Sequence, residues 1–131
     1  MIELYNIGIS DGTLKSMIEI NPEISELSDK EIIKKIEILK EINCNKTQIL
    51  NIISSNPIFL SRGINEIIKL LSCLQEIGFT CLNILFDSNP YILNLEPFEI
   101  KKYINNRINQ GEMLEDIVDD LDSNPYLFQE I

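Results

Sequence analysis

The sequence predicts an all-α protein, an α-solenoid of about three helix–proline-turn–helix repeats followed by half a repeat. Asn-Pro pairs recur at intervals of 35, 33 and 35 residues, beginning at Asn21, Asn56, Asn89 and Asn124. Between them, apolar residues recur with the 3.6-residue period of an α-helix, and no segment shows the alternation typical of a strand. A fixed period of 20–50 residues indicates repeats that bury their apolar faces against their neighbours.

The first repeat begins with a short helix that we expect from about Asp11 to Ile20. Ser10 or Asp11 can cap its first turn, because a short oxygen-bearing side chain accepts bonds from the free N–H groups there. Leu14, Met17 and Ile18 lie on one face. The helix ends at Asn21 because the ring of a proline disfavours α-helical geometry in the residue before it.

A longer helix follows, and Ser28 and Glu31 form a capping box at its start. Its apolar stripe contains Ile32, Ile33, Ile36, Leu39 and Ile42. We expect the intervening polar residues to face water: Lys34, Lys35, Glu37 and Glu41. Asn43 stands where the residue after a helix tolerates a left-handed conformation.

The pattern then repeats with small changes. A short helix from about Lys46 to Ser54 precedes the second Asn-Pro pair, and a longer helix from about Ile64 to Ile77 follows. Thr80 can cap the next short helix. Proline at the favoured first position opens another longer helix at Glu96-Pro97, with Ile100, Ile104 and Ile108 as its stripe and Gly111 as its end. A last short helix presents Leu114, Ile117 and Leu121 before Asn124.

The repeats agree at the level of single side chains. Seven residues before each Asn lies an apolar residue: Leu14, Ile49, Leu82 and Ile117. Two residues after each Pro lies another: Ile24, Phe59, Ile92 and Leu127. We therefore expect one domain over residues 1–131, with repeat units at about 8–43, 44–78 and 79–111 and a half unit at 112–131.

The residue types exclude several kinds of catalytic and metal site. The chain has no histidine, so it has no Ser-His-Asp or Cys-His arrangement and no histidine-ligated zinc site. Asp120, Asp122 and Asn124 have the oxygen spacing of a calcium loop, but Pro125 stands where such a loop needs glycine. The sequence therefore predicts no enzyme, no metal and no cofactor.

Charge and cysteine content bear on partners and compartment. The net charge is −10, and residues 112–131 contribute seven acidic and no basic residues to it. The start of the chain has no basic, apolar leader pattern, and no apolar stretch approaches the ~20 residues of a membrane span. The three cysteines form no CxxC pair, which favours reduced thiols and a cytoplasmic protein.

The repeat resembles that of the mitochondrial transcription termination factor (mTERF) family. The resemblance rests on Ser55-Asn56-Pro57-Ile58-Phe59-Leu60 with the helix from Leu70 to Gly78, and on Ser88-Asn89-Pro90-Tyr91-Ile92-Leu93. It covers nearly the whole chain. It implies an α-solenoid with a concave groove and, by the habit of the family, nucleic-acid binding through basic residues in that groove.

Six basic residues on the long helices are the candidate nucleic-acid contacts: Lys34, Lys35, Lys69, Lys101, Lys102 and Arg107. Binding to phosphates needs enough Lys and Arg to release counterions, and this chain has 11 in all. Acidic residues stand among the six on the same helices. The alternative is a mixed, solvated surface.

The C-terminal end provides the other candidate. The last repeat has its turn but no long helix, which leaves Tyr126, Leu127 and Phe128 without the cover that their counterparts receive. Either this end docks on a protein partner or a copy of itself, or it folds back as a cap. With the acidic stretch beside it, this end favours a non-catalytic module that binds a protein partner, with nucleic-acid binding as the alternative.

Overall fold

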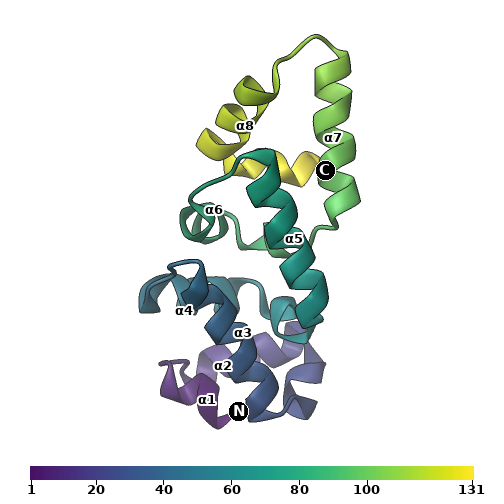
Figure 1. Cartoon of the computed structure of the whole chain (residues 1–131). Coiled ribbons are helices and arrows are strands. Elements are labelled where there is room, and N and C mark those ends of the chain that lie inside the picture. Colours follow the sequence, from purple (N-terminus) through teal and green to yellow (C-terminus); the bar gives the residue numbers. More distant parts are fainter. The chain divides into compact units, whose positions relative to one another are not determined.

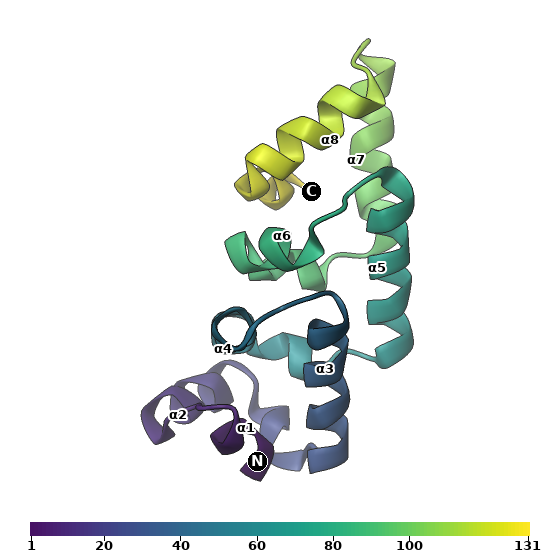
Figure 2. The ribbon, with the colours of Figure 1, turned by 60° about the vertical axis from the view of Figure 1, so that its left-hand side comes forward.

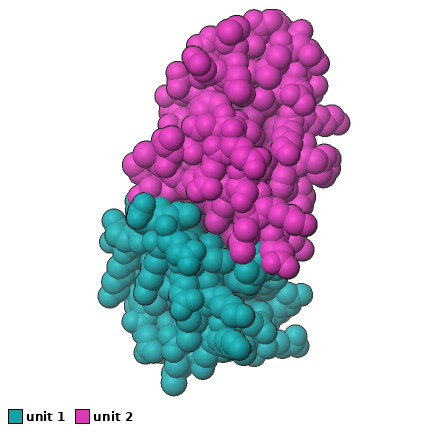
Figure 3. All heavy atoms as spheres, viewed as in Figure 1, with its two compact units in different colours: residues 1–64 teal, residues 65–131 magenta.

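The computed structural model describes residues 1–131 as eight α-helices and four 3₁₀ helices, with no β-strand. The fold is the all-α helical repeat of the solenoid type that the sequence predicts. The chain divides into two compact units, residues 1–64 and residues 65–131 (Figure 3). The boundary between them falls inside the predicted repeat 44–78, between its proline turn and its long helix.

The first unit contains two short helices, one long helix and two proline turns in addition to a short N-terminal helix (Figure 1). Its elements are α1 (Ile2–Asn6), α2 (Asp11–Ile20), η1 (Pro22–Glu26), α3 (Asp29–Glu41), α4 (Lys46–Ser55) and η2 (Pro57–Ser61). The predicted helices match α2, α3 and α4 to within one or two residues. The helix α1 was not expected from the sequence.

The second unit consists of α5 (Ile64–Ile77), α6 (Leu82–Ser88), η3 (Pro90–Asn94), α7 (Pro97–Asn109), α8 (Leu114–Ser123) and η4 (Pro125–Glu130). Figures 1 and 2 both show α8 beside α7, with which it is in contact. Its core is apolar and continuous, formed by Ile67, Leu70, Cys73, Leu74, Phe79, Leu82, Leu85, Phe86, Ile92, Leu93, Ile100, Ile104, Ile117, Leu121 and Phe128.

Side-chain caps fix several helix starts. The Ser28 hydroxyl accepts a bond from the Glu31 N–H at 3.2 Å, which is one half of the capping box expected at the start of α3; the reciprocal bond from the Ser28 N–H to the Glu31 side chain is not formed. Full capping boxes open α4, with Asn45, and α7, with Glu96. The predicted Thr80 cap is wrong, because α6 begins at Leu82 after Cys81 and has no side-chain cap.

The predicted left-handed residues end the long helices. Asn43 has a φ of 71° after α3, and Gly111 has a φ of 97° after α7. Asparagine and glycine tolerate this region at low cost, whereas a β-branched residue does not. Each long helix of the two units therefore stops where the sequence places its end.

Each proline of an Asn-Pro pair begins a 3₁₀ helix, an element that the sequence did not predict. The apolar residue two places after the proline is fully buried in the first three turns, at Ile24, Phe59 and Ile92. In the fourth turn Leu127 is only partly buried, and the neighbouring Phe128 fills the core instead.

The asparagine of the pair connects one turn to the next within a unit. In the first unit the Asn21 amide nitrogen donates to the Pro57 carbonyl at 3.1 Å and to the Ser61 hydroxyl at 2.7 Å. In the second unit Asn89 donates to the Pro125 carbonyl at 3.0 Å. The sequence predicts only a turn-forming role for these asparagines, because a bond to the next repeat leaves no local signal.

No helix of the chain is by itself long and apolar enough to cross a membrane. One pair, α5 with α6, satisfies the length and composition criteria jointly, but the two helices are bent by 111° at the break between them.

Candidate binding surfaces

Lys35 lies in the interior of the first unit, which corrects the expectation that it faces water. It is 5% exposed, and its ammonium group donates to the Leu60 carbonyl of η2 at 3.0 Å. Burial lowers the pKa of the Lys35 side chain, and the nearby Glu31 carboxylate only partly opposes that effect. The buried face of α3 is wider than its isoleucines alone indicate, and Lys35 lies on that face. A phosphate cannot reach this group without unfolding.

Arg107 is also engaged inside its own unit. Its guanidinium donates to the Glu112 carboxylate at 2.8 and 2.6 Å and to the Asp120 carboxylate at 2.9 Å. It lies 5.7 Å from the centre of the Tyr103 ring, a cation–π contact. The carboxylates raise the pKa of Arg107, and the guanidinium lowers the pKa of Glu112. Arg107 therefore joins α7 to α8, and its guanidinium is not available to contact a phosphate.

The other four predicted basic residues are exposed. Lys34 lies on the first unit. In the second unit Lys69 of α5 and Lys101 of α7 line one groove of about 310 Å³, so residues 32 apart in the sequence converge. Glu76 lines the same groove and partly offsets their charge. Lys102, the next residue on α7, lines a different hollow.

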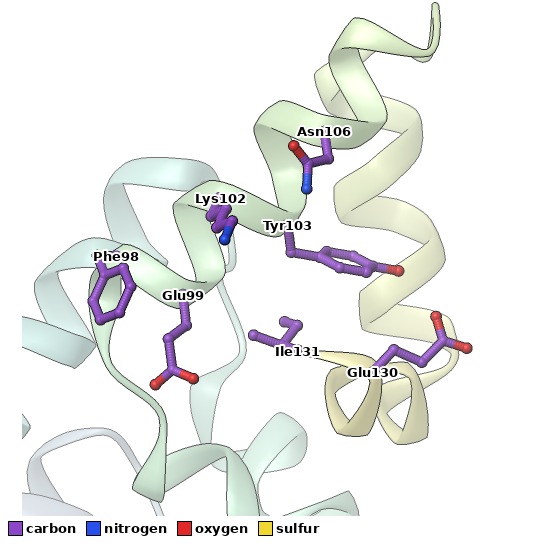
Figure 4. A pocket seen from close by; sticks show the side chains of 7 residues that line it. All are labelled: Phe98, Glu99, Lys102, Tyr103, Asn106, Glu130 and Ile131. Atoms are coloured by element: carbon purple, nitrogen blue, oxygen red, sulfur yellow. The ribbon is translucent and has the colours of Figure 1, made fainter.

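That second hollow, shown in Figure 4, lies between α7 and the C-terminal turn and holds about 300 Å³. Its lining comes from α7 and from the end of the chain: Phe98, Glu99, Lys102, Tyr103, Asn106, Glu130 and Ile131. Tyr103 extends from α7 towards the C-terminal turn. Phe98 is 68% exposed at the start of the helix. The lining mixes one cation, two carboxylates and two aromatic rings, without a dominant charge.

The cysteine in the α5–α7 groove is not an activated nucleophile. Burial raises the pKa of the Cys73 thiol, and the Lys101 cation, which acts in the opposite direction, does not offset it. A reactive cysteine needs a depressed pKa, because the thiolate is the attacking species. No three His, Cys, Asp or Glu side chains in residues 1–131 are placed to hold a metal ion.

The C-terminal end folds back onto its own unit. Phe128 is buried and packs against Phe79, with the ring centres 5.8 Å apart. Leu127 is partly buried, and Tyr126 is 65% exposed. Of the three residues expected at an interface, Phe128 is therefore unavailable and Tyr126 is the one that remains exposed. The sequence does not show that Phe79 lies against Phe128. Phe79 covers Phe128 in the way that a further long helix would.

The helix α8 concentrates the negative charge. Glu115, Asp116, Asp119 and Asp122 are exposed. No ion pair or side-chain hydrogen bond involves them, whereas Asp120 is taken up by Arg107. Asp119 and Asp122 lie near the C-terminal end of the helix, where a carboxylate is unfavourable to the helix dipole. The sequence therefore places charge on this surface at some cost to the helix itself.

A groove borders this acidic surface. It is formed by the end of α5 and by α8, holds about 310 Å³, and is lined by Ile77, Gly78, Leu114, Glu115, Val118 and Asp119. Beside it, Met113 is 69% exposed. The helical period predicts Leu114 on the core face, but it is 42% exposed and Ile117 and Leu121 fill the core.

Comparison with known proteins gives the family. A protein-family model, mTERF, matches residues 2–120. The chain belongs to the mTERF family. The match spans both compact units and confirms the resemblance seen in the proline turns and long helices. No curated protein and no solved structure matches the chain.

Proposed function

We propose that this mTERF-family chain is a non-catalytic helical-repeat module that binds a basic protein partner through its second unit. The observation that carries the proposal is the set of four exposed carboxylates on α8, which have no partner in their own chain. Unpaired surface charge of one sign attracts a surface of the opposite sign and speeds its association.

The distribution of charge between the units supports this assignment to the second. Residues 1–64 carry seven basic and nine acidic side chains, and residues 65–131 carry four and twelve. Because Arg107 is already paired with Glu112 and Asp120, three free cations remain in the second unit. A polyanion would therefore meet net repulsion there, whereas a basic protein would be attracted.

Nucleic-acid binding is the second candidate, and a specific observation favours it. Lys69 and Lys101 converge on one groove, Lys102 follows on α7, and Phe98 is exposed one turn away. Aromatic rings beside cations can stack bases while the cations contact phosphates. Membership of the mTERF family adds weight to this candidate. With Lys35 and Arg107 engaged internally, however, only four of the six expected cations are available.

Affinity purification from cells tests the proposal. The intact chain is compared with a variant in which α8 is neutralised by Glu115→Gln, Asp116→Asn, Asp119→Asn and Asp122→Asn. All four residues are exposed, so the fold is retained. We expect basic proteins to be enriched with the wild-type chain and lost with the variant, as measured by quantitative mass spectrometry. The three cysteines are free thiols, so the cytoplasm is the compartment we propose and from which the extract is taken.

A matched control variant neutralises charge away from α8. Glu19→Gln, Glu23→Gln, Glu26→Gln and Glu37→Gln alter four exposed carboxylates of the first unit and should leave recovery unchanged. Recovery that survives neutralisation of α8 but disappears after nuclease treatment would contradict the proposal and favour the nucleic-acid candidate.

A further inference from the structure

The groove between α5 and α8 has an apolar floor and an acidic rim. Leu114 and Val118 are one helical turn apart on α8 and so lie on the same side of it, and Ile77 faces them from the end of α5. Glu115 and Asp119 form the adjacent row of the helix and edge the groove. An apolar strip and an acidic strip therefore run side by side along one helix.

In the first unit the corresponding place also holds a hollow, of about 280 Å³, but its lining differs and includes Lys40, Cys44 and Lys46. The short helix α4 stands in the same position in its repeat as α8, and Gly8 corresponds to Gly78 as the residue that ends the preceding helix. A methyl group at Gly8 would lie 3.6 Å from Leu50 and 3.7 Å from Lys46, whereas nothing lies within 4 Å of the same position at Gly78. The side chains of α4 therefore approach the end of the preceding helix more closely than those of α8 do.

The charge of the two places also differs. Leu114, Glu115 and Asp119 correspond to Lys46, Thr47 and Asn51 of α4, each pair being 68 residues apart. Those three residues of the first unit include one cation and no anion. The apolar floor and the acidic rim therefore occur together only in the second unit.

We propose that the α5–α8 groove docks an amphipathic helix of a basic protein. The apolar residues of that helix, spaced three or four apart, would contact Leu114, Val118 and Ile77, and its Lys or Arg residues would face Glu115, Asp119 and Asp122. This is the helix-in-groove mode, in which apolar anchors give affinity and flanking charges give orientation and a fast on-rate. The inference rests on the proposed function and assigns it a site and a partner geometry.

Two fluorescent peptides serve as probes in anisotropy titrations of the intact chain at 0.15 M ionic strength. The first is an amphipathic lysine–leucine helix, and the second has the same lysines but serine in place of every leucine. We expect the leucine peptide to bind at least about tenfold more tightly, because burying one or two leucine side chains corresponds to that change or more. Equal affinities would show that charge alone is recognised and would contradict the proposal that the groove docks the helix.

Variants of the chain locate the site. Leu114→Gln should weaken the leucine peptide about tenfold and leave the serine peptide unchanged. Ile84→Gln is the matched control, since Ile84 is 57% exposed on α6 of the same unit and does not line the groove. If Leu114→Gln and Ile84→Gln bind the leucine peptide equally well, the groove is not the site, although the proposed function stands. If neither peptide binds to the wild type, the proposed function itself fails.

Sedimentation of the chain without peptide tests whether a second copy of the chain occupies the groove instead. We expect a monomer whose sedimentation coefficient is the same for the wild type and Leu114→Gln. A concentration-dependent dimer that Leu114→Gln abolishes would show that a second copy fills the groove, and the basic helix would be excluded as its occupant.

Discussion

The two compact units repeat one another at a distance of 68 residues but differ in how their long helices are held. Asn21 and Asn89 are 68 residues apart, as are Asn56 and Asn124. On the same scale Lys35 of α3 corresponds to Tyr103 of α7, and both lie in the middle of a 13-residue helix. Lys35 bonds to a backbone carbonyl in the interior, whereas Tyr103 lies under Arg107.

Most of the buried apolar positions of the first unit are apolar in the second as well, but Leu39, Cys44 and Ile52 correspond to Arg107, Glu112 and Asp120. Ile32, Ile36 and Ile49 of the first unit correspond to Ile100, Ile104 and Ile117 of the second, and all six are buried. The apolar period therefore determines the repeat, because burial of these side chains is the main stabilising contribution. The polar contacts and the outward charge vary from unit to unit, and they give the second unit its acidic surface.

The largest effect is expected at the C-terminal turn, where the second unit covers itself. Phe128→Ala should lower the free energy of unfolding by about 3–5 kcal/mol, because it removes a buried ring from contact with Phe79. Tyr126→Ala is the control and should change stability by less than about 0.5 kcal/mol, since Tyr126 is largely exposed. Urea denaturation measures both. Equal effects of the two substitutions would mean that the turn is not part of the core.

The asparagines of the turns should differ from one another. Asn89→Ala removes the donor to the Pro125 carbonyl and should cost about 1–3 kcal/mol in a site shielded from water. Asn124 bonds instead to the Asp120 carbonyl and carboxylate of its own helix, at 3.2 and 3.1 Å, and is partly exposed. Asn124→Ala should therefore cost less than Asn89→Ala. Thermal unfolding of the two variants shows which loses more stability. A larger loss for Asn124→Ala would contradict the conclusion that the bond from Asn89 holds the two turns together.

The buried lysine should give the first unit a pH dependence in the alkaline range. Because burial lowers the folded-state pKa of Lys35 below the ordinary 10.5, the unfolded chain binds more protons, and stability rises with pH between the folded and unfolded pKa values. The difference in unfolding free energy between the wild type and Lys35→Met should increase over this window. For Lys34→Met, at an exposed residue, it should stay constant. If the difference in unfolding free energy between the wild type and Lys35→Met does not change with pH, the ammonium group of Lys35 is exposed to water.

The ion pairs of the second unit should give a smaller dependence in the acid range. Arg107 lowers the folded-state pKa of Glu112 below 4.5, so the contribution of this pair is present above that value and is lost as the pH falls through the folded pKa. Wild type and Glu112→Gln should therefore converge in stability on acidification. Glu130→Gln serves as the control, since Glu130 has no ion pair. Parallel curves for the wild type and Glu112→Gln would show that the Arg107–Glu112 pair does not contribute.

Much of the fold could be predicted because it depends on local signals. Caps, prolines and left-handed positions such as Asn43 fix where helices begin and end, and the apolar period indicates their buried faces. The asparagine bonds between turns could not be predicted, because they join residues 36 or more apart in the sequence.

The candidate site was harder to predict because side-chain direction decides it. Lys35 and Arg107 look like solvent-facing cations in the sequence, and only the three-dimensional contacts with Leu60 and Glu112 show that they are engaged. The acidic character of residues 112–131 was visible from composition. The groove beside it was not, since it is formed by residues of α5 and α8 that lie far apart in the sequence.

A single competition separates the two candidate functions of the second unit. The lysine–leucine peptide is titrated with the intact chain at 0.15 M ionic strength, and a short double-stranded DNA is then added as a competitor for the chain. A reference titration of peptide with DNA alone corrects for their direct association. Our account predicts that the chain binds the peptide and that the DNA removes no more peptide from the chain than the reference titration accounts for. In a separate titration, labelled DNA should give no anisotropy change with the chain even at low salt. Binding of labelled DNA that weakens steeply with salt, and no binding of the peptide, would contradict it.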